Sequence, residues 1–412
     1  YSFIFLCLLI FPSITSMGMS LITPSNTIIN HLQLSIPDYG VSHYNITQDV
    51  TYEVVLNFTF THRDSMWQYY FRFARFNTRM PNSSLTRYCP PYQESTLNYS
   101  KMSSNILPSD IREGHHDKFN NTYDSFNATL SPDESISFDQ RYIVKLNAIT
   151  FQDIEPADIG VYDTSDEMFE LYCNNSEQFY ERDDSDLITL SNNIVDVNDS
   201  IVIKAEKICD WVSKYIVYNR YLDEEMGALW AYENLQGDCS EYSSLMVTLL
   251  RIQGIPARKV TGFVVSNYAS TRPSVGQTWN YYSTESETTI LGHAWVEYYV
   301  PEIGWIVCDP TWNSGGSYFN RIDFLHFNLN VGANFLFPPY GIVSEFGNPG
   351  IIYNPSLDYE YNYNVRITVL EANLAPLAPF PLFVVIFIGA GVAVVLIAIA
   401  LIMRRKKEII SY

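Results

Sequence analysis

The sequence has 412 residues, a net charge of −20 at pH 7 and 47% hydrophobic residues. The length allows two or three domains, and the apolar content is sufficient for a hydrophobic core. The excess of 45 acidic over 25 basic residues repels phosphate backbones, which argues against nucleic-acid binding. The many tyrosines and phenylalanines, 31 and 24 copies, favour β-strands.

A short apolar segment opens the chain. Residues 3–11 (FIFLCLLIF) are too few to span a bilayer, and Pro12 and small polar residues follow them. This pattern is typical of a secretory signal, so residues 1–19 are predicted to be a signal-peptide remnant, with an uncleaved second anchor as the alternative. Because the chain begins with Tyr1 and lacks a basic start, we expect the natural N-terminus to be missing.

Residues 20–190 are predicted to form a β-rich extracellular domain that resembles a β-sandwich. Apolar and polar residues alternate there, as in half-buried strands, over residues 31–36, 50–61, 69–76, 136–146 and 148–151. The polar stretch 77–135 between them is interpreted as one long decorated loop. The acidic cluster 181–186 (ERDDSD) is interpreted as a solvated linker, with a calcium site as the alternative.

Two helices are predicted in the next region. The first begins near residues 198–200 (NDS), which are good N-caps, and continues with apolar residues at helical spacing to Tyr215. The second begins at Cys239, because Asp238 and Glu241 form a D-x-x-E capping box and Gly254 follows the apolar run. Cys239 therefore lies in the first turn of a helix, where the helix dipole favours a thiolate.

Two predicted strands follow, GHAWVEYYV at residues 292–300 and GWIVC at residues 304–308. If Val300 pairs with Gly304 across the turn, His293 lies diagonal to Asp309 on the same face, where the acid can orient the imidazole. The polar stretch 266–290 before His293 is either a substrate rim or a surface insertion. Each motif alone also has an ordinary structural explanation.

Taken together, GDCSEYSSLMVTLLRIQGIPARKVTGFVV and GHAWVEYYVPEIGWIVCDPTW resemble the transglutaminase-like superfamily. The resemblance covers residues 200–315 and carries Cys239, His293 and Asp309 in the order and spacing of the family's catalytic triad. It implies a papain-like α+β domain at residues 195–320, in which a helix bearing the cysteine packs on an antiparallel sheet. GIPAR at residues 254–258 also matches the family and is interpreted as a structural turn.

The resemblance implies a cysteine enzyme. His293 would take the proton from Cys239, and the thiolate would attack a carboxamide to give a thioester. Asp309 would orient the imidazole, and the backbone N–H of Cys239 would stabilise the oxyanion. Trp230, Tyr218 and Gln236 are candidates for a second oxyanion donor, among which the sequence does not choose. No cofactor or metal is expected.

The C-terminal region contains the predicted anchor. Residues 321–379 are predicted as a short β segment and a Pro-rich spacer, with a strand at 363–370. Residues 380–403 are uncharged and long enough to cross a bilayer, and the basic cluster RRKK opens the tail 404–412. The protein is therefore predicted to be a single-pass cell-membrane protein with its N-terminal bulk outside.

Glycosylation sequons and cysteines agree with an extracellular location. Eight N-x-S/T sites lie before residue 200, at Asn45, Asn57, Asn82, Asn98, Asn120, Asn127, Asn174 and Asn198. If Cys239 is the reactive thiol, the four other cysteines outside the signal allow three disulfide connectivities. The pair Cys89–Cys173 is preferred, because both precede the catalytic region.

The sequence thus predicts a cell-surface thiol enzyme acting on peptide or protein amides by hydrolysis or acyl transfer, which it does not separate. A non-enzymatic adhesion or scaffold protein that retains the fold, and a peptide-N-glycanase-like amidase, are the alternatives. The partners expected are a peptide or protein substrate and the membrane. The sequence indicates neither the specific substrate nor the oligomeric state.

Overall fold

The computed structural model describes residues 43–78, 89–220, 222, 224–313, 316–332, 335–337, 341–343, 349–352 and 357–376. The predicted signal remnant, the strand predicted at 31–36, the membrane span at 380–403 and the basic tail lie outside these residues. Within the described part, no helix is long and apolar enough to cross a bilayer.

The large sheet is antiparallel and has the strand order β10-β18-β1-β6-β13, with β3 also paired to β6. Its strands are β1 (Tyr44–His62), β3 (Gln93–Met102), β6 (Ser135–Phe151), β10 (Thr278–Thr284), β13 (Arg321–Ile322) and β18 (Tyr359–Asn373). The large sheet therefore contains strands from both sides of the predicted domain boundary at residues 190–195. β10 lies inside the stretch 266–290, so the middle of that stretch is an edge strand of this sheet.

Strict alternation of apolar and polar residues explains why β1 forms and which face it buries. The even-numbered residues from Val50 to Phe60 are buried, whereas the residues between them are partly or fully exposed. The predictions of strands at 50–61, 136–151 and 363–370 are confirmed by β1, β6 and β18. The buried face of β1 covers different elements at its two ends.

At one end, the large sheet packs on a small sheet with the order β17-β2-β5-β4. Its strands are β2 (Trp67–Ala74), β4 (Ile111–His116), β5 (Thr122–Leu130) and β17 (Gly350–Ile352). Aromatic rings fill the space between the sheets, with the ring of Phe58 centred 5.0 Å from Phe73 and 5.7 Å from Phe71. Two antiparallel sheets thus face each other, as in a sandwich, although both contain strands from beyond residue 270.

The polar stretch 77–135 is not the single loop predicted from its composition. The structure places β3, β4 and β5 in it, together with a 3₁₀ turn at Pro108–Asp110. β3 is mostly exposed or half-buried and therefore lacks the apolar residues that mark a strand in sequence. Cross-strand pairing with β6 nevertheless holds it in the large sheet.

At its other end, the large sheet covers the central sheet, which has the order β12-β11-β9-β14. Its strands are β9 (Ala257–Val264), β11 (Gly292–Val300), β12 (Gly304–Cys308) and β14 (His326–Val331). The Tyr52 hydroxyl of β1 donates to the Phe324 carbonyl at 2.9 Å, and its ring is centred 5.1 Å from that of Phe327. The central sheet therefore packs on the large sheet through aromatic side chains.

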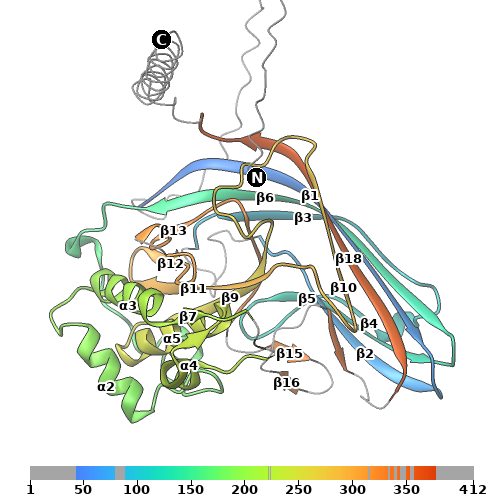
Figure 1. The fold of residues 1–412 in the computed structure, drawn as a ribbon, viewed down its shortest axis with the longest axis horizontal. Helices are drawn as coiled ribbons and strands as arrows, with labels where there is room; N and C mark the ends of the chain where they lie inside the picture. The colour runs from blue at the N-terminus through green and yellow to red at the C-terminus, as the bar shows by residue number, and fades with distance from the viewer. Residues whose placement is uncertain are drawn as a thin grey trace, which may run out of the picture. The chain divides into compact units, whose positions relative to one another are not determined.

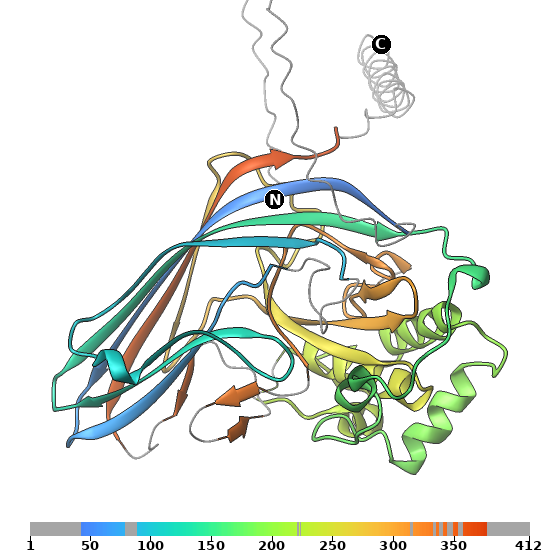
Figure 2. The same ribbon diagram turned by 180° about the vertical axis from the view of Figure 1, so that it is seen from behind.

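Helices cover the other side of the central sheet. They are α1 (Glu167–Tyr172), α2 (Ser185–Ile194), α3 (Ile201–Tyr215), α4 (Ala228–Asn234) and α5 (Cys239–Ile252). α5 contacts β9 and β11, and α2, α3 and α4 pack around α5. Figures 1 and 2 show the helices and the strands β2, β4 and β5 at opposite ends of the long strands β1, β3 and β6.

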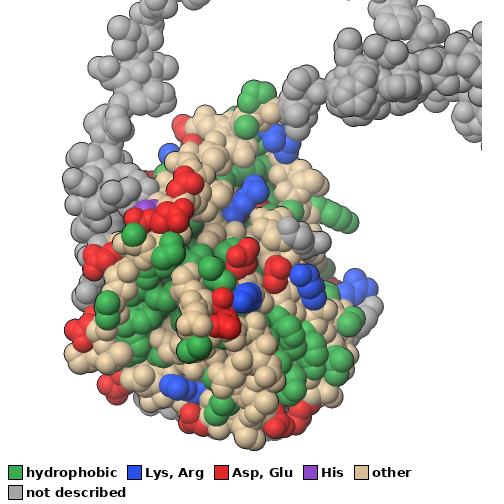
Figure 3. Space-filling view, turned by 90° about the vertical axis from the view of Figure 1, so that its left-hand side faces the viewer, with side chains coloured by type: hydrophobic (Ala, Val, Ile, Leu, Met, Phe, Trp, Pro, Cys, Tyr) green, Lys and Arg blue, Asp and Glu red, His purple; other side chains and the backbone are tan. Residues whose placement is uncertain are grey.

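The remaining elements are short. They are β7 (Val217–Tyr218) paired with β8 (Gln236–Gly237), β15 (Phe335–Phe337) paired with β16 (Gly341–Val343), and a 3₁₀ turn at Pro156–Asp158. The acidic cluster 181–186 has a local role, because Asp184 caps α2 and Glu181 accepts from the backbone of Leu229. On the face in Figure 3, the described acidic and basic side chains are interspersed, without a continuous basic patch.

The preferred disulfide is absent from the structure. Cys173 is a buried free thiol whose Sγ donates to the Arg251 carbonyl at 3.7 Å. Cys209 and Cys308 are also free thiols in the buried core, and Cys239 is a free thiol with partial exposure. The prediction of a Cys89–Cys173 bridge was therefore wrong, because the side chain of Cys173 is directed to the end of α5.

Candidate active site

Cys239 is the first residue of α5, and the predicted capping box sets its position. The Asp238 side chain accepts from the backbone N–H of Ser240 at 2.7 Å, and the Glu241 side chain accepts from that of Asp238 at 3.0 Å. A Cβ on Gly237 would lie 2.3 Å from the Cβ of Glu241, so only glycine fits before the cap. The sequence therefore places the thiol at the N-terminus of a buried, well-formed helix.

The hairpin of β11 and β12 has the register predicted from its turn, with Val300 opposite Gly304 and Val296 opposite Cys308. His293 donates from Nε2 to Asp309 Oδ2 at 2.7 Å, and both side chains are buried. Cys308 lies on the opposite face, where its Sγ is 3.9 Å from the Met246 sulfur of α5. The alternation of side chains across a strand thus separates Cys308 from the site.

Two of the three residues predicted for the triad, Cys239 and His293, line one cavity of about 400 Å³, and Asp309 is hydrogen-bonded to His293. Cys239 comes from α5 and His293 comes from β11. A hydrogen bond between the two side chains is one of the interactions that raise the pKa of His293. Asp309 lies behind His293 and is fully buried. A cavity of this size is within the range that small-molecule and peptide ligands occupy.

Electrostatics favour a charged imidazole in this place. Burial alone would lower the pKa of His293, but the negative charge and hydrogen bond of Asp309, together with Cys239, raise it to about 9. Burial alone would raise the pKa of Asp309, but the charges and hydrogen bonds of His293 and His326 hold it well below its usual range. An ionised acid next to an imidazolium is the arrangement that a cysteine nucleophile requires.

Asp309 is held by four hydrogen bonds. Its Oδ1 accepts from the backbone N–H groups of Thr311 and Trp312 at 2.9 and 3.2 Å. Its Oδ2 accepts from His293 at 2.7 Å and from Nε2 of His326 at 3.3 Å. The turn after β12 therefore fixes one oxygen and leaves the other for two imidazoles.

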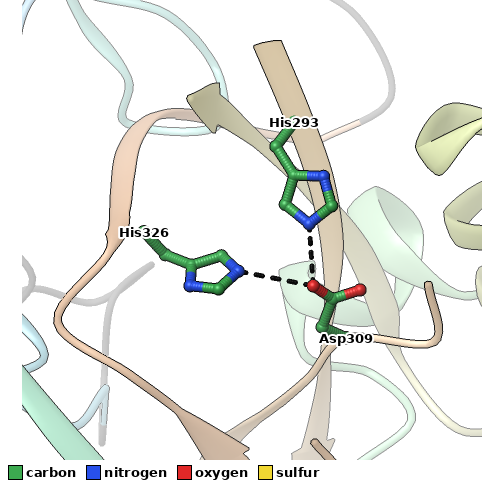
Figure 4. Close-up of side chains that lie close together, drawn as sticks. All are labelled: His293, Asp309 and His326. Atoms are coloured by element: carbon green, nitrogen blue, oxygen red, sulfur yellow. Dashed lines mark hydrogen bonds and ion pairs between the residues drawn. The ribbon is translucent and has the colours of Figure 1, made fainter. Parts of the chain in front are cut away.

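His326 is a site residue that the sequence analysis missed. Figure 4 shows the Asp309 carboxylate between the two imidazole rings. The other nitrogen of His326, Nδ1, donates to Asp323 Oδ1 at 2.7 Å, and Asp323 Oδ2 accepts from the Tyr318 hydroxyl at 2.5 Å. All these side chains are buried, so the triad continues as a chain of alternating charges.

No local pattern in the sequence could have identified His326. It opens β14, within a stretch interpreted only as short strand-like pieces, and its alignment with Asp309 depends on the pairing of β14 with β9. That pairing has a register shift between Asn328 and Asn330. The useful signal would have been the D-x-x-H spacing of Asp323 and His326, which is also common by chance.

His293, Asp309 and His326 are also arranged so that they could hold a metal ion, since one ligand atom from each lies within 4.8 Å of the others. Both ring nitrogens of His326 already face carboxylate oxygens, at 3.3 and 2.7 Å. A metal would replace the hydrogen bond between His293 and Asp309. The hydrogen-bonded network therefore accounts for the geometry of these three residues.

Tyr218 is a candidate oxyanion donor whose hydroxyl is influenced by the charge of Cys239. Pairing of β7 with β8 sets Tyr218 opposite Gly237, two residues before the thiol. Burial and the negative charges of Cys239 and Asp238 raise the pKa of Tyr218 to about 12, so its hydroxyl is protonated and can donate. Gln236 accepts from the Asn219 side chain at 3.3 Å through its oxygen, which leaves its NH2 group able to donate, and Trp230 lies on α4.

The remaining charges at the cavity are partly neutralised. Lys259 forms an ion pair with Glu225, and the Ser244 hydroxyl donates to Glu225 at 2.8 Å. The charge of Glu225 offsets the effect of burial and raises the pKa of Lys259. This ion pair connects Glu225, which precedes α4, to Lys259 of β9 at the wall of the cavity that contains Cys239.

Comparison with known proteins identifies the region that contains the site. Residues 188–310 match the family model of the transglutaminase-like superfamily, and Cys239, His293 and Asp309 all lie within them. The uncharacterised protein YebA from Bacillus subtilis is 38% identical over 89 residues, which are 22% of this chain and 11% of YebA. A protein-glutamine gamma-glutamyltransferase from Pseudomonas aeruginosa is 35% identical over 81 residues, which are 20% of this chain and 11% of that protein.

A solved structure resembles a larger part of the chain. The crystal structure of a suspected cysteine protease from Cytophaga hutchinsonii aligns with a TM-score of 0.52 and 15% identity, covering 82% of this chain and 96% of that one. At this identity the likeness concerns the fold alone. The protein thus has a transglutaminase-like fold of mixed α and β content, and the family match supports a cysteine-dependent enzyme.

Proposed function

We propose that this chain, which carries a domain of the transglutaminase-like superfamily at residues 188–310, is a thiol enzyme that acts on peptide or protein amides through a thioester on Cys239. The observation that carries the proposal is the 2.7 Å hydrogen bond between His293 and Asp309 behind a cavity lined by Cys239. The proposal includes both acyl transfer to an amine and hydrolysis by water.

The first half of the reaction forms the thioester. His293 uses Nε2 for Asp309, which leaves Nδ1 to take the proton from Cys239. The Cys239 thiolate attacks the carboxamide carbon, so a C–S bond forms and the carbonyl oxygen becomes an oxyanion. The His293 imidazolium then protonates the departing nitrogen, the C–N bond breaks, and ammonia or an amine leaves.

The second half regenerates the thiol. Water or a second amine attacks the thioester, His293 takes a proton from the attacking atom, and the C–S bond breaks. The products are a carboxylic acid or a new amide. The backbone N–H of Cys239 and the hydroxyl of Tyr218 are the proposed donors to the oxyanion in both halves.

The proposed place of action is the outer surface of a cell, with residues 20–379 outside and residues 404–412 inside. The support for this is the uncharged run 380–403 followed by RRKK, together with the sequons before residue 200. A peptide or exposed protein segment is the substrate class that fits such a location.

The test uses a glutamine-containing peptide and the full chain. Wild-type protein is expected to release ammonia, cleave the peptide or incorporate a primary amine, and Cys239→Ala is expected to abolish all three. Cys308→Ser is the matched control, because Cys308 is buried on the other face of β12. If none of the three products depends on Cys239, the proposed reaction is wrong, and release of glycan from a glycopeptide then separates the amidase alternative from the scaffold alternative.

A further inference from the structure

A second cavity, of about 130 Å³, adjoins the catalytic cleft. Thr261, Gly262 and Gly292 line both cavities. Gly292 immediately precedes His293 on β11, so the second cavity borders the strand that carries the catalytic imidazole. This cavity plays no part in the triad or in the charge network behind it.

The walls of the second cavity are mainly apolar and come from three strands far apart in sequence. Phe263 of β9, Leu329 of β14 and Val365 of β18 are each at most 5% exposed. An apolar cavity of ~150 Å³ is known to hold a molecule of the size of benzene. A space of about 130 Å³ therefore suits a branched aliphatic side chain.

The two glycines at the junction of the cavities differ in the space around them. A Cβ on Gly262 would lie 1.8 Å from the carbonyl oxygen of Phe327, so β14 approaches β9 too closely for any side chain there. A Cβ on Gly292 would instead meet no atom within 4 Å. The space beside Gly292 is therefore open, and it is the place where the passage can be closed by substitution.

Two polar atoms at this cavity have no hydrogen-bond partner among the described residues. They are Thr261 Oγ1 and Asn330 Oδ1, and Asn330 is 3% exposed. Buried polar groups are nearly always hydrogen-bonded in folded proteins. A ligand that brings an N–H group along with an apolar side chain would satisfy Asn330, and a peptide does both.

We propose that this cavity is a subsite for an aliphatic side chain, of about leucine size, that neighbours the reacting amide in a peptide substrate. The subsite rests on the proposed function, because it is defined by its position beside Cys239 and His293. Its occupant contacts Phe263, Leu329 and Val365, and its backbone N–H donates to Asn330. The preferred substrates are therefore peptides with a leucine or valine next to the residue that reacts.

The experiment compares alkylation of Cys239 by two N-substituted iodoacetamides, one with an isobutyl arm and one with a hydroxyethyl arm. In both reactions the sulfur displaces iodide, so an S–C bond forms and a C–I bond breaks. The measured quantity is the ratio of the two rate constants, divided by the same ratio for glutathione. This quotient cancels the intrinsic reactivities of the two probes and of the thiol.

The wild-type quotient is expected to be about tenfold in favour of isobutyl, in line with the selectivity of apolar enzyme pockets for a few carbon atoms. Gly292→Val should reduce it to about one. Gly292→Ala, with a smaller side chain, should reduce it partially and serves if the valine variant does not fold. Ser286→Val, an exposed position that lines neither cavity, should retain the wild-type quotient.

A wild-type quotient near one, or a quotient that Gly292→Val leaves unchanged, would refute the subsite. Val365→Ala should enlarge the cavity and move the preference toward a cyclohexylmethyl arm. The quotient is measurable even if Cys239 reacts no faster than glutathione. In that case the proposed enzyme function fails, while the subsite is still decided by the quotient.

Discussion

His326 is held between two buried carboxylates, with Nε2 facing Asp309 and Nδ1 facing Asp323. A ring that donates from both nitrogens is an imidazolium. Burial alone would lower the pKa of His326, but Asp323 and Asp309 together raise it to about 9. Burial of a single carboxylate is unfavourable because the charge loses its hydration. Where carboxylates alternate with imidazolium cations, the attraction between opposite charges offsets this cost. Orientation of His293 therefore depends on a residue outside the triad.

We expect His326→Gln to lower kcat by roughly tenfold or more with little change in KM, since it weakens the orientation of Asp309 and not substrate binding. A tenfold loss corresponds to about 1.4 kcal/mol of transition-state stabilisation. Steady-state kinetics on the peptide substrate measure both constants. Tyr318→Phe removes only the outer hydrogen bond, to Asp323, and should have a smaller effect. A change confined to KM would contradict this role for His326.

The pH dependence of activity should follow from the pKa of His293, which lies at about 9. The imidazolium form protonates the leaving nitrogen, so kcat/KM should fall as the pH rises through about 9. Asp309→Asn removes the negative charge that raises this pKa. The alkaline limb should therefore move to lower pH, in addition to a loss of rate.

A pH profile of kcat/KM from pH 5 to pH 10 measures this shift. Asp163→Asn, at an exposed position far from the cavity lining in sequence, is the control and should retain the wild-type profile. An alkaline limb at the same pH in wild type and Asp309→Asn would show that Asp309 does not set the charge of His293.

Among the elements, α5 was predictable because its determinants are local. Asp238 and Glu241 are three residues apart, and each satisfies a backbone N–H at the helix start. The β11–β12 hairpin was predictable for the same reason, because a short turn fixes the register that brings His293 to Asp309. The three predicted triad residues all came from these two local units.

Other elements were not predictable, because their stability comes from distant pairing. β3 has few buried residues of its own and is held by β6. β14 places His326 only through its pairing with β9, more than 60 residues earlier in the chain. Sequence periodicity reports which face of an element is apolar, but it does not report which strand lies next to it.

Substitutions of Asp238 can separate the effect of its capping hydrogen bond at the start of α5 from the effect of its negative charge next to Cys239. Asp238→Ala removes an N-cap and should lower the free energy of unfolding by about 1 kcal/mol. Asp238→Asn retains a good capping side chain while it removes the charge, so its stability should be close to wild type. Urea denaturation of the two variants and wild type measures the difference.

Alkylation rates of Cys239 in the same proteins show whether the cap also positions the thiol. Asp238→Asn keeps the hydrogen bond to the Ser240 N–H and should keep a single, homogeneous rate. Asp238→Ala should give a slower or heterogeneous reaction because the first turn frays. Equal destabilisation by alanine and asparagine would indicate that the charge of Asp238, and not its capping bond, stabilises the helix.

In the whole molecule, a hydrogen bond to a buried ion pair joins the β-rich part to the part that carries the triad. Arg258 of β9 and Glu297 of β11 form a fully buried ion pair at 2.6 Å, and the Arg258 guanidinium lies 3.8 Å from the centre of the Trp305 ring. Tyr92, which precedes β3, donates to Glu297 at 2.6 Å. The hydrogen bonding of this buried carboxylate is thus completed from the N-terminal part of the chain.

The site itself also draws on residues beyond the predicted catalytic segment 195–320. Asp323 and His326 extend the triad, and β14 is the strand next to β9 in the central sheet. Val365 of β18 forms a wall of the proposed subsite. A segment that ends at residue 320 would lack all of these, although it contains Cys239, His293 and Asp309.

We therefore expect a chain of residues 195–320 not to fold by itself, whereas a chain of residues 43–376 should fold. The short chain keeps the Arg258–Glu297 ion pair but loses Tyr92, and a buried group that loses a hydrogen-bond partner typically destabilises by ~1–3 kcal/mol. It also exposes the edge of β9 and the apolar residues that β14 covers. Since whole domains are stable by only ~5–15 kcal/mol, these losses should be decisive.

Thermal unfolding followed by circular dichroism should show a cooperative transition for residues 43–376 and none for residues 195–320. A cooperative transition in the short chain would mean that the triad segment is an autonomous domain, and that the contacts with the large sheet contribute little to its stability.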